Sequence, residues 1–316
     1  MAVIQVFDRP ASQAFYSVAG RLLFTECTNP ELRTPIVDLF SGWQLTPVSL
    51  PGRSPDIQIK FSCGEVSSGF PRDLDQFEIA EGGKCYTDAD GLYLELRGAV
   101  VQLVNGSSVT VDVSFTDLPQ LGDPLLGRAV SFAVCAGLRR YGLFDIHSAG
   151  VVETESGAGV LIVGPSGSGK STLALQLVQS GWSYLSDDEL LLSLNGAVVE
   201  ARGFRSFFAV SQVGAQSKHC FVLPAKRTEH ASPRALLFTS LNGDQRSELK
   251  ALTQAETMTR LLHACPWATY DKSIAGSNLA LLSTLVRQAR GFDLSAGRDL
   301  LESTFAASFI GQISLS

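Results

Sequence analysis

The sequence lacks the marks of a secreted, membrane-spanning or zinc-binding protein. Its six cysteines are scattered, with no Cys-x-x-Cys pair and no Cys/His cluster at zinc spacing. We therefore expect free, buried thiols in a reducing compartment. The first residues show no basic stretch followed by an apolar one, and no apolar run reaches the length of a membrane span. These absences favour a cytoplasmic protein without a membrane partner.

Positive charge is not in excess either. The chain carries 25 lysines and arginines against 31 aspartates and glutamates, for a net charge of −6. Such a balance argues against a broad nucleic-acid surface, so no nucleic-acid partner is expected. With 316 residues, of which 45% are hydrophobic, the chain is long enough and apolar enough for two globular domains.

The first part of the chain has the pattern of a β-rich domain. Alternating apolar and polar residues predict strands over residues 56–61, 92–96, 99–104 and 108–114. The last two are expected to form a hairpin across the Asn105–Gly106 turn. A loop over 117–124 precedes a predicted helix over 125–141. We therefore expect a β-rich domain over residues 1–120, serving substrate recognition or assembly, and a second domain over 121–316.

The second part alternates strands with helices, which predicts an α/β fold with a central mixed sheet. Strands are predicted over residues 146–152, 159–163, 182–189 (ending in an acidic turn), 190–194, 197–200 and 235–238, and helices over 171–178, 254–265 and 279–288. The Asn195–Gly196 turn predicts a hairpin, and Asn278 is the expected N-cap of the last helix. Leu294–Arg298 resembles the signature of ABC-transporter ATPases, but no strand ending in Asp-Glu follows it. A loop between helices is predicted there instead.

A complete P-loop, G-x-x-x-x-G-K-[ST], is the most informative motif of the chain. It follows an apolar strand and opens a helix, the context in which backbone N–H groups and a helix N-terminus face a phosphate chain. Lys170 is expected to contact the β- and γ-phosphates of ATP, and the Ser171 hydroxyl to bind Mg²⁺. The predicted nucleotide-binding residues are Gly164, Pro165, Ser166, Gly167, Ser168, Gly169, Lys170, Ser171 and Thr172.

Two adjacent carboxylates, Asp187 and Asp188, follow the strand after the P-loop helix. This position places them on the phosphate side of the sheet. One is expected to hold Mg²⁺, directly or through water, and the other to accept a hydroxyl proton. A solvated Ser-Asp-Asp turn without a role in chemistry is the alternative.

Four elements in order resemble the kinase domain of bacterial HPr kinase/phosphorylase, and more closely the shorter HPr-kinase-related kinases, which include those that modify lasso-peptide precursors. Residues 157–178 resemble the strand and P-loop of the family, and residues 181–188 resemble its Gly–aromatic–Asp-Asp element. Glu200-Ala-Arg-Gly-Phe204 resembles its Glu-x-Arg-Gly element, and Asp145-Ile-His147 resembles the position of its histidine. The resemblance covers roughly residues 145–205.

This resemblance implies roles for individual residues. Asp188 would be the catalytic base, supported by Asp187. Glu200 would join Ser171 at the magnesium ion, and His147 would orient the aspartates; a histidine with a purely structural role is the alternative for His147. The family's oligomers imply a homo-oligomer. Its later arginine- and asparagine-rich loop has no counterpart here, so the acceptor and phosphorolysis stay open.

Two classes of function follow from these observations. The first is an ATP-dependent kinase that transfers the γ-phosphoryl group to a hydroxyl, on a serine of a peptide or small protein of the lasso-precursor or HPr type, or on a small molecule. The second is a non-catalytic nucleotide sensor, which needs the P-loop but has no use for a base. Cationic residues downstream are candidates for assisting transfer, and their spacing selects none of them: Lys218, Lys226, Arg227 and Arg234.

Overall fold

The computed structural model describes residues 12–49, 51–64, 75–79, 83–88, 91–106, 108–211, 218–221 and 226–313. The chain has an α/β fold and divides into two compact units. The N-terminal unit consists of Met1–Ser41 and Leu45–Tyr141, and the C-terminal unit of Gly42–Gln44 and Gly142–Ser316. Among the described residues, no helix combines the length and the apolar composition needed to cross a membrane.

A nine-stranded sheet forms the N-terminal unit, in the order β3-β1-β2-β4-β9-β8-β7-β6-β5. Its strands are β1 (Gln13–Val18), β2 (Arg21–Cys27), β3 (Thr46–Pro47), β4 (Ile57–Cys63), β5 (Asp75–Ile79), β6 (Gly83–Thr87), β7 (Gly91–Leu96), β8 (Ala99–Val104) and β9 (Val109–Phe115). The pairs β2–β4 and β4–β9 are parallel and the others antiparallel. The strands predicted from alternation are confirmed, including the β8–β9 hairpin.

Helix α2 (Pro124–Arg139) belongs to this N-terminal sheet, not to the second unit. It packs on β4, β8 and β9, and it contacts α1 (Arg33–Ser41), which follows the short helix η1 (Pro30–Leu32). A Cβ atom on Gly137 would lie 2.8 Å from Ile57 Cγ2, so the helix backbone rests directly on β4. The units therefore divide at Tyr141–Gly142, about one helix later than the boundary expected near residue 120.

The C-terminal unit is built around a six-stranded sheet in the order β13-β11-β12-β19-β21-β20 and a four-stranded sheet in the order β10-β14-β15-β18. Its strands are β10 (Phe144–Ile146), β11 (Ser148–Val152), β12 (Gly159–Val163), β13 (Ser183–Ser186), β14 (Leu190–Asn195), β15 (Val198–Gly203), β18 (His230–Ala231), β19 (Pro233–Leu241), β20 (Glu248–Ala251) and β21 (Arg290–Ala296), with β16 (Phe208–Ser211) and β17 (Lys218–Phe221) as a separate pair. Because β12, β19 and β21 run parallel, their carboxyl ends lie at one edge of the sheet.

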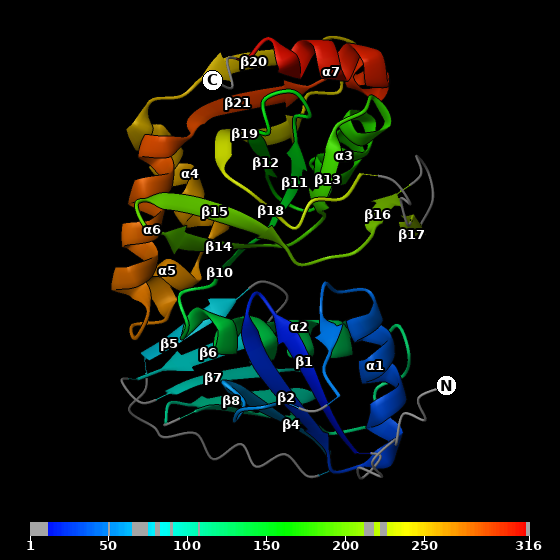
Figure 1. Ribbon diagram of the computed structural model, residues 1–316, viewed down its shortest axis with the longest axis vertical. Helices are drawn as coiled ribbons and strands as arrows, with labels where there is room; N and C mark the ends of the chain where they lie inside the picture. The colour runs from blue at the N-terminus through cyan, green and yellow to red at the C-terminus, as the bar shows by residue number, and fades with distance from the viewer. Residues whose placement is uncertain are drawn as a thin grey trace. The chain divides into compact units, whose positions relative to one another are not determined.

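Helices cover both faces of the six-stranded sheet (Figure 1). The helices of this unit are α3 (Lys170–Gln179), α4 (Gln254–Ala264), α5 (Trp267–Tyr270), which packs on α6 (Ala275–Gln288), and α7 (Ser303–Gly311), with the short helix η3 (Arg298–Leu301). Along β12, Val160 and Ile162 pack with α3 and α7, while Leu161 and Val163 face α4, α6 and the smaller sheet. Burying each of these side chains contributes about 1.5–3 kcal/mol. The P-loop strand is thus held from both sides.

Two predicted elements of this unit have different limits in the structure. The strand expected over 146–152 breaks at His147: β10 joins the four-stranded sheet and β11 the six-stranded one. The helix expected over 279–288 begins at Ala275, so Asn278 is not its N-cap. Asn278 is buried inside the first turn and its N–H donates to Ile274 O at 2.9 Å.

The segment expected as a loop between helices is also different. Leu294–Ala296 form the end of β21, which pairs with β19 and β20 inside the sheet. Only Gly297 separates this strand from η3. The prediction of a loop was wrong. The polar and glycine residues of Arg290–Ala296 are untypical of a strand, but pairing with β19 and β20 stabilises one there.

Candidate nucleotide and phosphotransfer site

The P-loop residues form a tight turn between β12 and α3. Gly167 and Gly169 adopt left-handed backbone angles, with φ of 82° and 90°. A Cβ on Gly164 would lie 2.6 Å from Ser168 Oγ and 2.7 Å from Thr239 O, so only glycine fits there. The first turn of α3 carries no acidic residue, which leaves its positive N-terminal end facing the loop. This is the geometry that binds a phosphate.

Lys170 lies across the mouth of this loop, with most of its side chain buried. Its ammonium donates to Gly164 O at 2.8 Å and to Pro165 O at 3.0 Å. Its Nζ is also 3.0 Å from His147 Nε2. The positive charge is therefore held where the β- and γ-phosphates of a nucleotide on this loop would lie.

His147 joins Lys170 to Asp188. Because it lies between β10 and β11, its ring stands at the point where the chain passes from one sheet to the other. Its Nδ1 is 3.4 Å from Asp188 Oδ1. Since a lysine ammonium has no acceptor, Nε2 accepts from Lys170, which leaves the proton on Nδ1 facing the carboxylate. The structure thus brings three of the predicted site residues into one chain of contacts.

The turn after β13 buries the side chain of Asp187 and exposes part of the side chain of Asp188. Asp188 has a left-handed φ of 66°, which aspartate tolerates better than most residues at a cost of about 1 kcal/mol or more. Glu189 N donates to Asp187 O at 2.8 Å and closes the turn. Asp188 lines the P-loop cavity with its side chain 46% exposed, whereas Asp187 is buried. Only Asp188 is therefore placed to meet a substrate.

A network of residues that sequence reasoning did not single out holds this turn. Ser186 Oγ accepts from Phe204 N at 3.0 Å and from Arg205 N at 2.8 Å, and donates to Glu189 O at 2.6 Å. Arg205 Nη2 pairs with Glu189 Oε2 at 2.8 Å, and both side chains are largely buried. Apart from the Ser186–Glu189 bond, these contacts join residues 16 to 19 positions apart, a separation that no local pattern signals.

Tyr184 contacts the backbone of the same network. Burial, and then the charge of Asp187, raise the pKa of Tyr184 well above its ordinary value. Its hydroxyl therefore stays protonated, and it lies 3.1 Å from both Arg205 O and Phe207 O.

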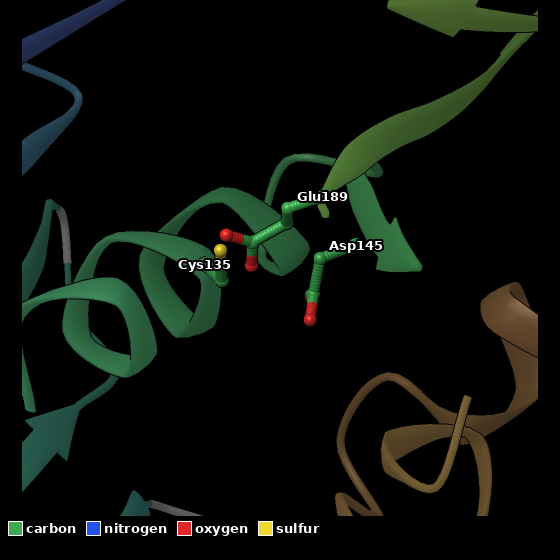
Figure 2. A group of neighbouring side chains, drawn as sticks. All are labelled: Cys135, Asp145 and Glu189. Carbon is green, nitrogen blue, oxygen red and sulfur yellow. The ribbon is translucent and has the colours of Figure 1, made fainter. Parts of the chain in front are cut away.

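Asp145, from the motif next to His147, lies near Glu189 (Figure 2). Their carboxylate oxygens are within 4.8 Å of each other. Glu189 is already paired with Arg205, and neither residue lines the P-loop cavity. Cys135, also labelled in Figure 2, belongs to the N-terminal unit. We therefore assign Glu189, through its pairing with Arg205, to the support of the turn.

A short segment from the first part of the chain completes this support. Gly42–Gln44, which we call the clip, lies between α1 and β3 in sequence but belongs to the C-terminal unit. Its backbone pairs with residues 204–206 through Gln44 N to Phe204 O at 2.7 Å and Ser206 N to Gly42 O at 2.9 Å. The Gln44 amide donates to Leu185 O at 3.0 Å and Arg205 O at 2.9 Å. The clip thus forms an isolated antiparallel bridge, Trp43 opposite Arg205, beside the turn.

Trp43, the middle residue of the clip, packs against two side chains of the same network. Its ring lies 4.9 Å from the Phe204 ring and 4.7 Å from the Arg205 guanidinium carbon. An arginine over an indole is held by its stacking as well as by its charge. Arg205 is therefore fixed from one side by Trp43 and from the other by Glu189.

Glu200, expected beside the magnesium ion, lies elsewhere. It stands on β15 opposite Ser193, three residues along β14 from Leu190, which corresponds to about 10 Å. Its carboxylate accepts from Asn195 Nδ2 at 2.8 Å and from Arg202 Nη2 at 3.1 Å. The structure does not bring Glu200 to the P-loop, because the register of the β14–β15 hairpin places this residue near the Asn195–Gly196 turn.

A cavity of about 650 Å³ opens over the P-loop. It lies at the carboxyl ends of β12, β19 and β21, where open α/β sheets place their ligands. The Ser171 hydroxyl and the Asp188 carboxylate both line it. Oxygen donors of this kind suit Mg²⁺ together with phosphate oxygens. The sequence carries no motif for a site at the wall formed by the carboxyl ends of β19 and β21 and the segments that follow them, so no site residue was predicted there.

No protein-family model matches the chain, and no curated protein sequence matches it. Among solved structures, the chain is similar to the Hpr(Ser) kinase/phosphatase from Coxiella burnetii. That alignment has 12% sequence identity and a TM-score of 0.33, and it covers 54% of this chain and 97% of that chain. A likeness of this size does not assign a family, so the function has to be inferred from the geometry of this chain.

Proposed function

We propose that the protein is an ATP-dependent kinase that transfers the γ-phosphoryl group to a hydroxyl, on a serine of a peptide or small protein. The observation that carries the proposal is the chain of contacts from Lys170 through His147 to Asp188 at the mouth of the P-loop cavity. A phosphate cradle alone fits any nucleotide-binding protein. A half-exposed carboxylate held beside that cradle supplies what phosphoryl transfer needs in addition.

The transfer step can be written from these positions. The acceptor oxygen forms a bond to the γ-phosphorus while the bond from that phosphorus to the β–γ bridging oxygen breaks, which leaves ADP. The hydroxyl proton passes to the carboxylate of Asp188. Lys170 and the N-terminus of α3 stabilise the charge on the phosphate oxygens. His147 keeps Asp188 oriented toward the acceptor.

A divalent cation fits the oxygen donors at this site. Ser171 would hold Mg²⁺ together with phosphate oxygens of the nucleotide, and the ion would neutralise part of the phosphate charge, which leaves Asp188 free to accept the proton. Asp187, which is buried, would act only through the position of Asp188. Glu200 is left out of this set because its carboxylate already binds Asn195 and Arg202.

The test is the Asp188→Asn variant, assayed with labelled ATP, Mg²⁺ and the peptides or small proteins encoded beside the gene. Transfer should fall by about 10²–10⁴-fold, because the proton acceptor is removed. Affinity for ATP, measured by calorimetry, should change little. Glu200→Gln is the matched control and should keep the wild-type rate. Full transfer by Asp188→Asn would show that the base is another group.

A non-catalytic nucleotide sensor is the second candidate, since the P-loop contacts of Lys170 serve binding equally well. It predicts that the wild-type protein binds ATP tightly, hydrolyses it slowly and phosphorylates none of the acceptors. In that case Asp188→Asn and the wild type should behave alike.

A further inference from the structure

The cavity over the P-loop continues into a second end with different chemistry. Leu241 and Leu301 are 63% and 53% exposed there, although leucine is usually buried. Exposed apolar side chains in the wall of a cavity are typical of a surface that meets a ligand. The residues of this end come from the last residue of β19 and from the segments that follow β19 and β21: Leu241, Gly243, Asp244, Gly297, Arg298 and Leu301.

The two segments are tied to each other, so this end is formed in advance. Arg298 N donates to Asp244 O at 2.9 Å, and Gly297 N donates to Ser247 Oγ at 2.8 Å. The Asp299 carboxylate accepts from Ser247 N at 2.8 Å. These contacts hold the wall without using the Asp244 carboxylate. A pocket that is already ordered loses less entropy when a ligand binds.

This apolar end is continuous with the phosphate end. A Cβ on Gly169 would lie 3.2 Å from Leu241 Cδ2, so Leu241 stands over the first turn of α3. Thr172 and Leu173, one and two residues after Ser171, line the same cavity. A molecule with its phosphates on the P-loop would therefore extend along α3 directly against Leu241.

We propose that this end is a nucleobase subsite that takes an amino-bearing purine, the adenine of ATP. This inference rests on the proposed nucleotide function. Leu241 and Leu301 offer apolar surface to the purine ring. The carboxylate of Asp244, which only accepts hydrogen bonds when ionised, recognises the exocyclic amino group. The P-loop end binds the phosphates through its positive charge. The apolar end contacts only the base, so it distinguishes a nucleotide from a bare polyphosphate.

The test compares ATP with inorganic tripolyphosphate, both with Mg²⁺, by calorimetry on the full chain. The wild type should bind ATP more tightly than tripolyphosphate. The double variant Leu241→Gln/Leu301→Gln should lose about tenfold in affinity for ATP and keep its affinity for tripolyphosphate. Both leucines are exposed, so the variant should fold. Leu194→Gln, at an exposed leucine on β14, is the matched control and should change neither affinity.

The outcomes separate this inference from the proposed function. Equal wild-type affinities for ATP and tripolyphosphate, or a double variant that loses both alike, would overturn the subsite. Binding of neither ligand by the wild type would instead overturn the nucleotide function itself. If the binding results agree with the subsite but no acceptor is phosphorylated, ATP recognition would stand and the proposed kinase activity would be rejected.

The role of Asp244 has its own readout. Purine riboside triphosphate differs from ATP only by the missing amino group. The wild type should prefer ATP by about tenfold, and Asp244→Ala should remove this preference while keeping the affinity for purine riboside triphosphate. A preference that survives in Asp244→Ala would assign the recognition to another group.

Discussion

Asp188 and Glu200 are two carboxylates of the same stretch of chain, and they differ in what surrounds them. Asp188 lies half exposed in the wall of the P-loop cavity, with His147 as its neighbour. Glu200 lies on β15 with Asn195 and Arg202 bound to its oxygens. The first carboxylate has room for a ligand, while the oxygens of the second already accept two hydrogen bonds.

The difference comes from backbone geometry. A left-handed residue turns the chain after β13 and aims Asp188 at the cavity. The antiparallel register of β14 and β15 carries Glu200 away from that turn. Closeness in sequence to a P-loop is therefore a poor guide to closeness in space when a hairpin lies between. The predictions below test the proposed contrast between Asp188 as the reacting carboxylate and Glu200 as a structural one.

The largest effect is expected at the neighbour of Asp188. His147→Ala should lower phosphoryl transfer by about 100-fold, because the orientation of Asp188 is lost while the nucleotide still binds. His147→Gln should restore part of the rate, since its amide can accept from Lys170 and donate to Asp188. The measurement is the transfer rate at saturating ATP across pH, with the KM for ATP determined alongside.

Asn195→Ala is the matching change at Glu200, since it removes that carboxylate's first partner. It should leave the transfer rate within about twofold of the wild type. A loss as large as that of His147→Ala would mean that both carboxylates belong to the reaction, and the contrast would be wrong.

A smaller effect, on folding stability, is expected at the clip. Gln44→Leu removes two hydrogen bonds and leaves the carbonyls of Leu185 and Arg205 without them. Unfolding in urea should show a loss of about 2 kcal/mol. Gln120→Leu, at an exposed glutamine, should change stability by less than about 0.5 kcal/mol. Equal losses in the two variants would show that the clip does not brace the Asp188 turn.

The smallest effect is expected from Glu200 itself. The hydrogen bond from Asn195 lowers the pKa of Glu200, and the charge of Arg202 adds to this against the opposing effect of burial. The folded state therefore prefers the ionised form, and the stabilisation is present above the ordinary pKa and is lost as the pH falls through the lowered one. Glu200→Gln should cost about 0.5 kcal/mol at pH 7, and the difference should vanish as the pH falls below the lowered pKa of Glu200. A difference that does not depend on pH would assign the effect to packing.

The elements near the P-loop could be predicted because their signals are local. The apolar run before Gly164, the glycines of the loop and the helix after Lys170 lie next to one another in sequence, and β12 and α3 confirm them. The Asn195–Gly196 turn likewise identified the β14–β15 hairpin. Asp188 was found for the same reason, since it closes the strand that follows the P-loop helix.

The rest of the site depends on distant parts of the chain. Leu241 and Leu301 form one wall only because β19 and β21 are parallel neighbours in the sheet. The predicted strand over 146–152 breaks at His147 because the chain before it pairs in the four-stranded sheet and the chain after it pairs in the six-stranded sheet. The support of Asp188 by Arg205 and the clip joins segments more than 140 residues apart in sequence, as the Gln44–Leu185 bond shows. No pattern within a short window carries these relations.

The clip has a consequence for how the chain is made. Trp43 and Gln44 leave the ribosome long before residues 185–206, with which they pair. At about 5–20 residues per second, the wait amounts to about 7–30 seconds. During synthesis the C-terminal unit therefore pairs residues 204–206 with a segment that has already emerged. A fragment that starts at Gly142 would be made without the clip and without the hydrogen bonds that it supplies to residues 185–206.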